Sequence, residues 1–126
     1  MKDYKKYYIL RAEPEIVYQA LTVPATIKLW SGHPAEISPE PGSEFSLFGG
    51  DIVGKNLEFE PNHKIVQQWY FGEDGEPSIV TIKLHPHAQG TSAELRHTNI
   101  PDEVYDEFVE GWDHAFFGSL QDFYDE

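Results

Sequence analysis

Residues 102–126, DEVYDEFVEGWDHAFFGSLQDFYDE, form the longest amphipathic stretch of the chain. Large apolar side chains recur there every three to four residues, which is the spacing of an α-helix with one buried face. The predicted face consists of Tyr105, Phe108, Trp112, Phe116, Ser119 and Phe123. Pro101 followed by Asp102 predicts a helix start with Asp102 as its N-cap. From Glu103 to Tyr124 the helix would be roughly 33 Å long, so we expect the other elements to wrap around it.

The rest of the chain predicts two short helices and a run of strands. The helices are expected at residues 14–21 and 25–30, each near a proline that suits a first helical turn. Extended segments are expected at residues 3–11, 33–38, 44–48, 52–59, 64–71, 78–85 and 91–98. Short turns rich in Gly, Pro and Asn separate the later strands and favour antiparallel pairing. The prediction is an α+β fold of order β-α-α-β6-α, with a curved seven-stranded sheet and a single domain over residues 1–126.

Composition and charge narrow the possible partners. The 126 residues include 9 Lys and Arg against 22 Asp and Glu, a net charge of −13. Such a charge argues against binding to nucleic acid or to anionic membranes. Without cysteine the chain has neither disulfides nor thiolate metal ligands, and no segment approaches the ~20 apolar residues of a membrane span. We therefore expect a cytoplasmic protein, as a monomer or weak homodimer, without membrane insertion.

The relative sizes of sheet and helix raise the question of a cavity. Seven strands at ~4.8 Å spacing make a sheet roughly 29 Å wide. One helix about 10 Å thick cannot fill the concave side of such a sheet. The chain has 18 aromatic residues, from Phe 8, Tyr 7 and Trp 3, which can either fill that space or line it. Both alternatives, a packed core and a lined pocket, remain open from the sequence.

If a pocket exists, its predicted ligand-binding residues are mostly aromatic. They are Trp30, Trp69, Phe71, His97, Trp112 and Phe116. In this interpretation Trp112 and Phe116 line the helix side, with Trp69 or Phe71 opposite and Trp30 near the mouth. His97 would be the polar group of a mostly apolar site. The alternative is that the tryptophans only pack the core and that His97 bonds a neighbouring strand or a tyrosine hydroxyl.

Small residues and other histidines allow further interpretations. Gly111, Ala115 and Gly118 share one edge of the last helix, which indicates close backbone contact, room for a ligand, or a dimer contact. Gly49-Gly50 is typical of a tight turn with positive φ rather than a phosphate-binding loop. His85 and His87 have the alternate spacing of a metal site, but a solvated turn is the simpler interpretation. We predict no catalytic residue, metal or cofactor.

Five motifs, in order along the chain, carry a family resemblance. They are AEPEIVYQALT (12–22), LWS (29–31), PGSEFSLFGGDIVG (41–54), IVQQW (65–69) and EGW (110–112). Together they resemble the C-terminal domain of the activator of the heat-shock-protein-90 ATPase and its single-domain relatives. The resemblance extends from about residue 7 to residue 124. The order of elements is similar to the helix-grip arrangement of the START-like (SRPBCC) superfamily.

The resemblance implies the fold, and three functions stay open: one is suggested by the aromatic-rich packing of helix on sheet and two by the resemblance. The first is a non-enzymatic domain that binds a small hydrophobic molecule between the sheet and the last helix. The second is a co-chaperone-type module that interacts with a heat-shock-protein-90-like chaperone. The third is an enzyme of the cyclase or hydrolase type, which requires at least two polar groups, one of them His97, to converge inside the cavity.

Overall fold

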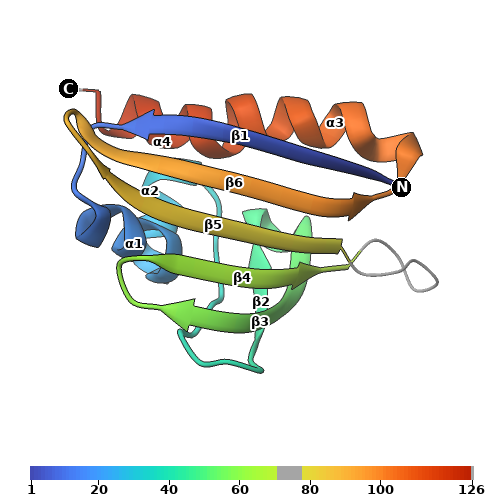
Figure 1. Cartoon of the computed structure of the whole chain (residues 1–126). Coiled ribbons are helices and arrows are strands. Elements are labelled where there is room, and N and C mark those ends of the chain that lie inside the picture. The colour runs from blue at the N-terminus through green and yellow to red at the C-terminus, as the bar shows by residue number, and fades with distance from the viewer. Residues whose placement is uncertain (71–77, 126) are drawn as a thin grey trace.

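The structure is a computed structural model that describes residues 1–70 and 78–125. Its centre is a six-stranded antiparallel sheet with the strand order β1-β6-β5-β4-β3-β2. The strands are β1 (Lys2–Leu10), β2 (Glu44–Leu47), β3 (Ile52–Glu60), β4 (Lys64–Trp69), β5 (Ser78–His87) and β6 (Gly90–Ile100). The sheet curves, and the C-terminal helix runs beside β1 and covers the inner side (Figure 1). The expected α+β order with a C-terminal helix is therefore confirmed.

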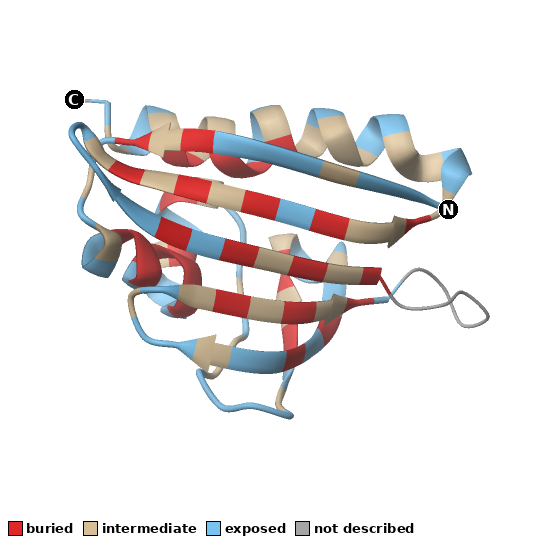
Figure 2. Ribbon diagram, in the orientation of Figure 1, coloured by how far each residue is buried: buried red, intermediate tan, exposed pale blue. Residues whose placement is uncertain are grey.

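One face of the sheet is buried and the other faces solvent, so burial alternates along each strand. In β5 the side chains of Val80, Ile82 and Leu84 are buried, whereas the residues between them are half-buried or exposed. The same alternation continues into β6, where Leu95 and His97 are fully buried (Figure 2). Alternation arises because successive side chains of a strand point to opposite faces.

The seventh strand, expected at residues 33–38, is absent, and the sheet has six strands. Only Glu36 pairs with the sheet, through hydrogen bonds with the backbone of Ser46. Pro34 and Pro39 flank this bridge and lack the backbone N–H that would extend the ladder. The segment therefore lies along β2 as a single bridge, and it contributes Ile37 to the edge of the core.

The two short helices, α1 (Pro14–Thr22) and α2 (Pro24–Ser31), follow the predicted pattern closely. Each has a proline in its first turn, where the missing N–H is not needed. Gly32 ends α2 in the left-handed conformation, with φ of 78°. The Trp30 indole N–H donates to the Ala20 carbonyl at 2.7 Å, so the two helices are joined by a buried hydrogen bond.

The C-terminal helix differs from the predicted uniform helix. It begins with a 3-10 turn, Asp102–Val104, and continues as α3 (Tyr105–Glu110), a wider π segment (Gly111–Phe116) and α4 (Phe117–Phe123). The prediction of Asp102 as N-cap was wrong. The Asp102 carboxylate instead forms an ion pair with the N-terminal amine at 2.9 Å. Within the described residues, no helix has both the length and the apolar composition needed to cross a membrane.

The π segment changes which residues of the last helix are buried. A π turn contains more residues than an α turn, so side chains beyond it are rotated relative to a regular helix. Phe117 and Leu120 are fully buried, whereas Ser119 is half-buried and Phe123 is 39% exposed. The predicted inward positions of Ser119 and Phe123 were therefore wrong. Gly118 accommodates the distortion, because a Cβ there would lie 2.4 Å from the carbonyl oxygen of Asp113.

Candidate functional site

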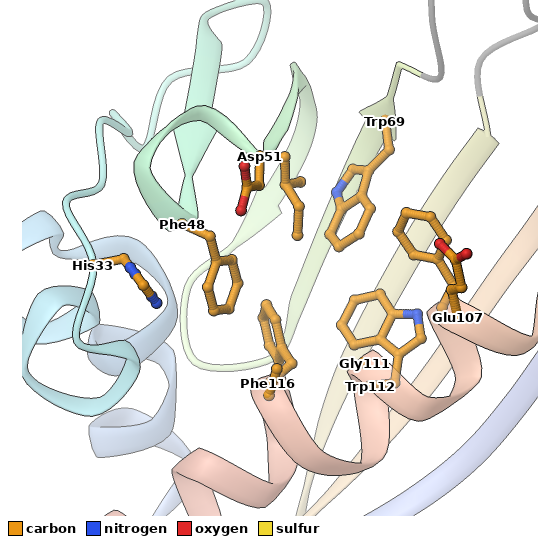
Figure 3. Close-up of a pocket in the computed structure, with 11 residues that line it drawn as sticks. His33, Phe48, Asp51, Trp69, Glu107, Gly111, Trp112 and Phe116 are labelled. Atoms are coloured by element: carbon orange, nitrogen blue, oxygen red, sulfur yellow. The ribbon is translucent and has the colours of Figure 1, made fainter. Parts of the chain in front are cut away.

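A pocket of about 470 Å³ lies between the last helix and the β2–β4 end of the sheet (Figure 3). Most of its wall is aromatic, with three ionisable side chains among the lining residues. The lining residues are His33, Phe48, Asp51, Ile52, Trp69, Glu107, Phe108, Gly111, Trp112, Ala115 and Phe116. They come from the segment after α2, the turn between β2 and β3, the start of β3, the end of β4, and the α3–π part of the last helix.

Two stacked indoles form the centre of the wall. Trp69 on β4 and Trp112 on the π segment have ring centroids 4.9 Å apart and an interplanar angle of 24°. The helix side is completed by Phe108, whose ring meets Trp69 edge-on at 6.2 Å, and by Phe116, 4.7 Å from Trp112. Offset and edge-on aromatic pairs are attractive beyond their buried area, so the wall is firmly packed although it borders a cavity.

A buried polar chain orients Trp69. Its indole N–H donates to Gln67 Oε1 at 3.0 Å, and Gln67 Nε2 donates to Asn56 Oδ1 at 3.0 Å. Asn56 Nδ2 in turn donates to Ser43 Oγ at 3.1 Å. Asn56 is fully buried and Gln67 almost so, and neither leaves a polar atom unsatisfied among the described residues. Because each amide is held at both ends, the rotamer of Trp69 is set by the sheet behind it.

His97 orients Trp112 in the same way. The Trp112 indole N–H donates to His97 Nδ1 at 3.0 Å, and His97 Nε2 lies 2.9 Å from Ser78 Oγ. An acceptor at Nδ1 implies the neutral tautomer with hydrogen on Nε2, which then donates to Ser78. Burial lowers the pKa of His97 from 6.5 to about 4, which favours this neutral state.

The far side of the pocket depends on the turn after β2. Phe48 adopts a left-handed conformation with φ of 53°, and Gly49 and Gly50 also have positive φ. The turn expected at Gly49-Gly50 is therefore present, and it is more contorted than a simple hairpin. It places the Phe48 ring 6.2 Å from Phe116 and 6.1 Å from Trp30. A positive φ at a bulky residue is unfavourable, so the turn is held by its surroundings.

The structure brings together only part of the predicted site. Trp69, Trp112 and Phe116 line the pocket as expected. His97 and Trp30 lie behind the wall, where His97 bonds Trp112 and Trp30 packs against Phe116 at 5.1 Å. Phe71 lies outside the described residues. The role of these six residues in binding stays a prediction.

Sequence reasoning missed Phe48, Phe108 and the three ionisable groups of the rim. Phe108 was placed on the inner helix face, and that assignment could have indicated its role. Phe48 precedes the Gly-Gly turn, whose tight geometry could have indicated that the ring folds back over the sheet. The three small residues on one edge of the last helix have different roles. Gly111 and Ala115 border the pocket, whereas Gly118 lies close to the backbone of its own helix.

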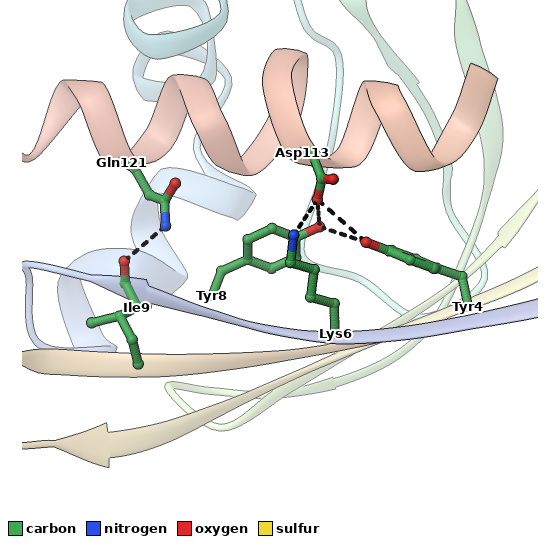
Figure 4. Close-up of polar contacts among 6 residues, drawn as sticks. All are labelled: Tyr4, Lys6, Tyr8, Ile9, Asp113 and Gln121. Carbon is green, nitrogen blue, oxygen red and sulfur yellow. Dashed lines mark hydrogen bonds and ion pairs between the residues drawn. The ribbon is translucent and has the colours of Figure 1, made fainter. Parts of the chain in front are cut away.

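The opposite flank of the helix is closed by a polar cluster (Figure 4). Asp113 Oδ1 accepts hydrogen bonds from Tyr8 at 2.7 Å, Lys6 at 2.8 Å and Tyr4 at 3.3 Å. These hydrogen bonds, above all the one from Lys6, hold the pKa of Asp113 below its usual range. The pKa of Tyr8 is raised, mainly by burial and next by its hydrogen bond to Asp113. Gln121 adds a bond to the Ile9 carbonyl at 3.2 Å, which ties α4 to the edge strand β1.

The described residues hold no group of three or more His, Asp or Glu that could bind a metal. His85 instead lies 3.1 Å from Glu94 on the outer face of the sheet. Ser119 Oγ bonds the His114 carbonyl, which is not a general base. The two histidines weighed as a metal pair are thus engaged in local contacts, His85 with Glu94 and His87 with the backbone N–H of Gln89.

Comparison with known proteins gives a consistent result. The sequence profile of the family described as "Activator of Hsp90 ATPase homolog 1-like protein" matches residues 11–124. An uncharacterized protein of Schizosaccharomyces pombe is 28% identical over 97% of this chain and 34% of its own length. An "Activator of 90 kDa heat shock protein ATPase homolog" from Dictyostelium discoideum is 38% identical over 58% of this chain and 20% of its own length. The chain thus spans about a third or less of these curated relatives.

Two solved structures match this chain over nearly their full length. An HSP90 activator from Plasmodium falciparum superposes with a TM-score of 0.88 and 28% identity, covering 98% of this chain and 96% of that one. The Aha1 dimer from Colwellia psychrerythraea has a TM-score of 0.86 at 22% identity, with 98% and 96% coverage. The second likeness shows the fold alone.

Proposed function

The chain belongs to the family of activator of Hsp90 ATPase homolog 1-like proteins, and from that premise we propose that it is a non-enzymatic binding domain for a small hydrophobic molecule. The observation that carries this proposal is the pocket of about 470 Å³ in front of the stacked Trp69 and Trp112 rings. Small-molecule sites are typically concave, mostly apolar and supplied with a few placed polar groups.

The energetics of the wall support a preformed site. Each pocket tryptophan has its indole N–H satisfied by a buried acceptor on the sheet, His97 for Trp112 and Gln67 for Trp69. The two rings are only 3% and 2% exposed, and the part of each that borders the pocket has no unpaired donor. Burying apolar ligand surface there yields roughly 25 cal/mol per Å², with little side-chain ordering left to oppose it.

Native mass spectrometry of the protein purified from its own cells tests this proposal. We expect a retained small molecule in the wild type and its loss in Ala115→Phe, because residue 115 borders the pocket. The matched control is His114→Phe, which adds an aromatic ring at the neighbouring exposed position outside the pocket. The proposal would be contradicted if the wild-type protein retained no molecule, so that extraction with organic solvent left its mass unchanged.

A second candidate is a co-chaperone-type interaction with a heat-shock-protein-90-like chaperone. It is favoured by the Plasmodium falciparum HSP90 activator, a protein of nearly the same extent with 28% identity. The test is the ATP hydrolysis rate of the chaperone from the same organism, measured with and without this chain. We expect stimulation that saturates with concentration, and an unchanged rate together with no complex in sedimentation would exclude the role.

The enzyme hypothesis is not proposed further. It requires at least two polar groups converging in the cavity, with His97 among them. His97 lies behind Trp112, and its Nδ1 accepts the indole hydrogen bond. The ionisable residues that do line the pocket, His33, Asp51 and Glu107, come from three separate segments at its rim.

A further inference from the structure

The pocket has an aromatic interior and a negatively charged rim. Asp51 reaches it from the turn before β3, and Glu107 from the first turn of α3, on the opposite wall (Figure 3). Neither carboxylate has a salt-bridge partner among the described residues, and both residues are exposed. Among the described lining residues there is no Lys or Arg. A cation in the pocket would thus face two carboxylates, and His33 is the remaining ionisable residue of the lining.

The interior is also suited to a cation. The rings of Phe48, Trp69, Phe108, Trp112 and Phe116 all border the same space. The faces of aromatic rings carry negative electrostatic potential, and tryptophan is the strongest of the three ring types in binding cations. An apolar anion would meet this potential and the two carboxylates as repulsion, whereas a neutral molecule would gain only from burial of its surface.

Charge is distributed unevenly over the whole molecule, and the distribution points the same way. On the solvent face of the sheet the two signs are mixed: Lys55, Lys83 and Arg96 lie among Glu44, Glu58 and Glu94. Residues 102–125 along the helix hold eight Asp and Glu and no Lys or Arg. The pocket opens between helix and sheet on the acidic side, so the field of the protein raises the local concentration of cations at its mouth.

We propose that the ligand of this pocket is a hydrophobic organic cation, an amine or quaternary ammonium group attached to an apolar body. This inference rests on the proposed binding function and specifies the chemical class of its ligand. The apolar body lies against the stacked Trp69 and Trp112 rings, and the cationic group lies at the rim between Asp51 and Glu107. The stabilisation comes from apolar burial, cation–π contact and two partly screened carboxylates acting together.

Three probes with the same hydrocarbon chain test the charge preference: octyltrimethylammonium, octanesulfonate and octanol. Binding is followed by NMR of the indole N–H signals, because the three tryptophans have separate, known hydrogen-bond partners. We expect saturable shifts of the Trp69 and Trp112 signals, with the cation binding roughly tenfold more tightly than octanol and the sulfonate binding least.

Two charge-matched double variants locate the effect. Asp51→Asn with Glu107→Gln removes both rim carboxylates, and we expect octyltrimethylammonium to bind roughly threefold to tenfold more weakly while octanol is unaffected. Glu103→Gln with Glu110→Gln removes the same charge from helix positions outside the pocket lining, and should leave the cation's affinity within about twofold. An equal loss in both double variants would overturn the assignment to the rim.

The remaining outcomes separate the two proposals. Equal affinity for all three probes, or a preference for the sulfonate, would overturn the cationic class while leaving hydrophobic binding in place. No shift of Trp69 or Trp112 with any probe would remove the proposed binding function itself, and the inference with it.

Discussion

The two halves of the last helix have opposite surroundings. Beyond the π segment, Phe117 and Leu120 are fully buried, and Phe117 stacks on Tyr8 at 4.3 Å with the planes 10° apart. Before it, Phe108 is only partly buried, and at its first residue, Gly111, no neighbouring atom lies within 4 Å of a built Cβ. One half is sealed against β1 and α2, and the other half borders a pocket.

The difference shows how one helix can serve both stability and binding. The sealed half lies against the edge strand β1, to which Gln121 of α4 bonds directly, and Asp113 of the π segment bonds the same strand. The open half faces the part of the sheet that curves away from it, where only large aromatic rings reach across. The π segment separates the two halves, and at its end Phe116 and Phe117 are both buried at consecutive positions.

The largest expected effect comes from removing a ring of the sealed half. Phe117→Ala should lower the free energy of unfolding by about 3–5 kcal/mol, because the site is fully buried and would leave a cavity. Phe108→Ala in the open half should lower it by less than about half as much, since Phe108 already borders empty space. Urea denaturation measures both, and equal losses would show that the two halves are not different in packing.

The next effect concerns the boundary, where His97 holds Trp112. The pKa of His97 is about 4 when folded and 6.5 when unfolded, so between these values the unfolded state binds more protons. Stability should therefore fall as the pH falls from 6.5 towards 4, by about 3 kcal/mol in total. Denaturation midpoints across this pH range measure the loss.

Two variants assign that loss to its residue. His97→Gln removes the titrating group and should flatten the profile between pH 6.5 and pH 5, at a lower overall stability. His114→Gln removes an exposed histidine of the last helix, two residues from Trp112, and should retain the wild-type profile. A wild-type profile in His97→Gln would show that another group is responsible.

The smallest expected effect compares two glycines of opposite surroundings. Gly118→Ala should destabilise by about 1–3 kcal/mol, because the new Cβ would clash with the Asp113 carbonyl across the π turn. Gly111→Ala should stabilise by about 0.5–1 kcal/mol, since alanine is the better helix former and the space is open. Thermal unfolding gives the sign of each change, and the same sign in both variants would refute the contrast.

Much of the fold followed from local patterns. Extended segments expected at residues 78–85 and 91–98 correspond to β5 and β6, and prolines suited to a first helical turn predicted α1 and α2. Local patterns suffice here because a strand or a helix buries one face, and apolar residues therefore recur with the period of that element. Trp69, Trp112 and Phe116 were assigned to the pocket wall for the same reason.

Only the tertiary structure decided the remaining features. A seventh strand needs a partner backbone with matching donors, and Pro34 and Pro39 limit that partnership to one bridge. The π turn accompanies the burial of the consecutive residues Phe116 and Phe117. A fixed period of 3.6 residues does not predict such a turn. The roles of His97 and Phe48 depend on residues distant in sequence, Trp112 and Phe116. The sequence by itself thus determined which faces are apolar, whereas long-range packing decided which apolar residues close the core and which border the pocket.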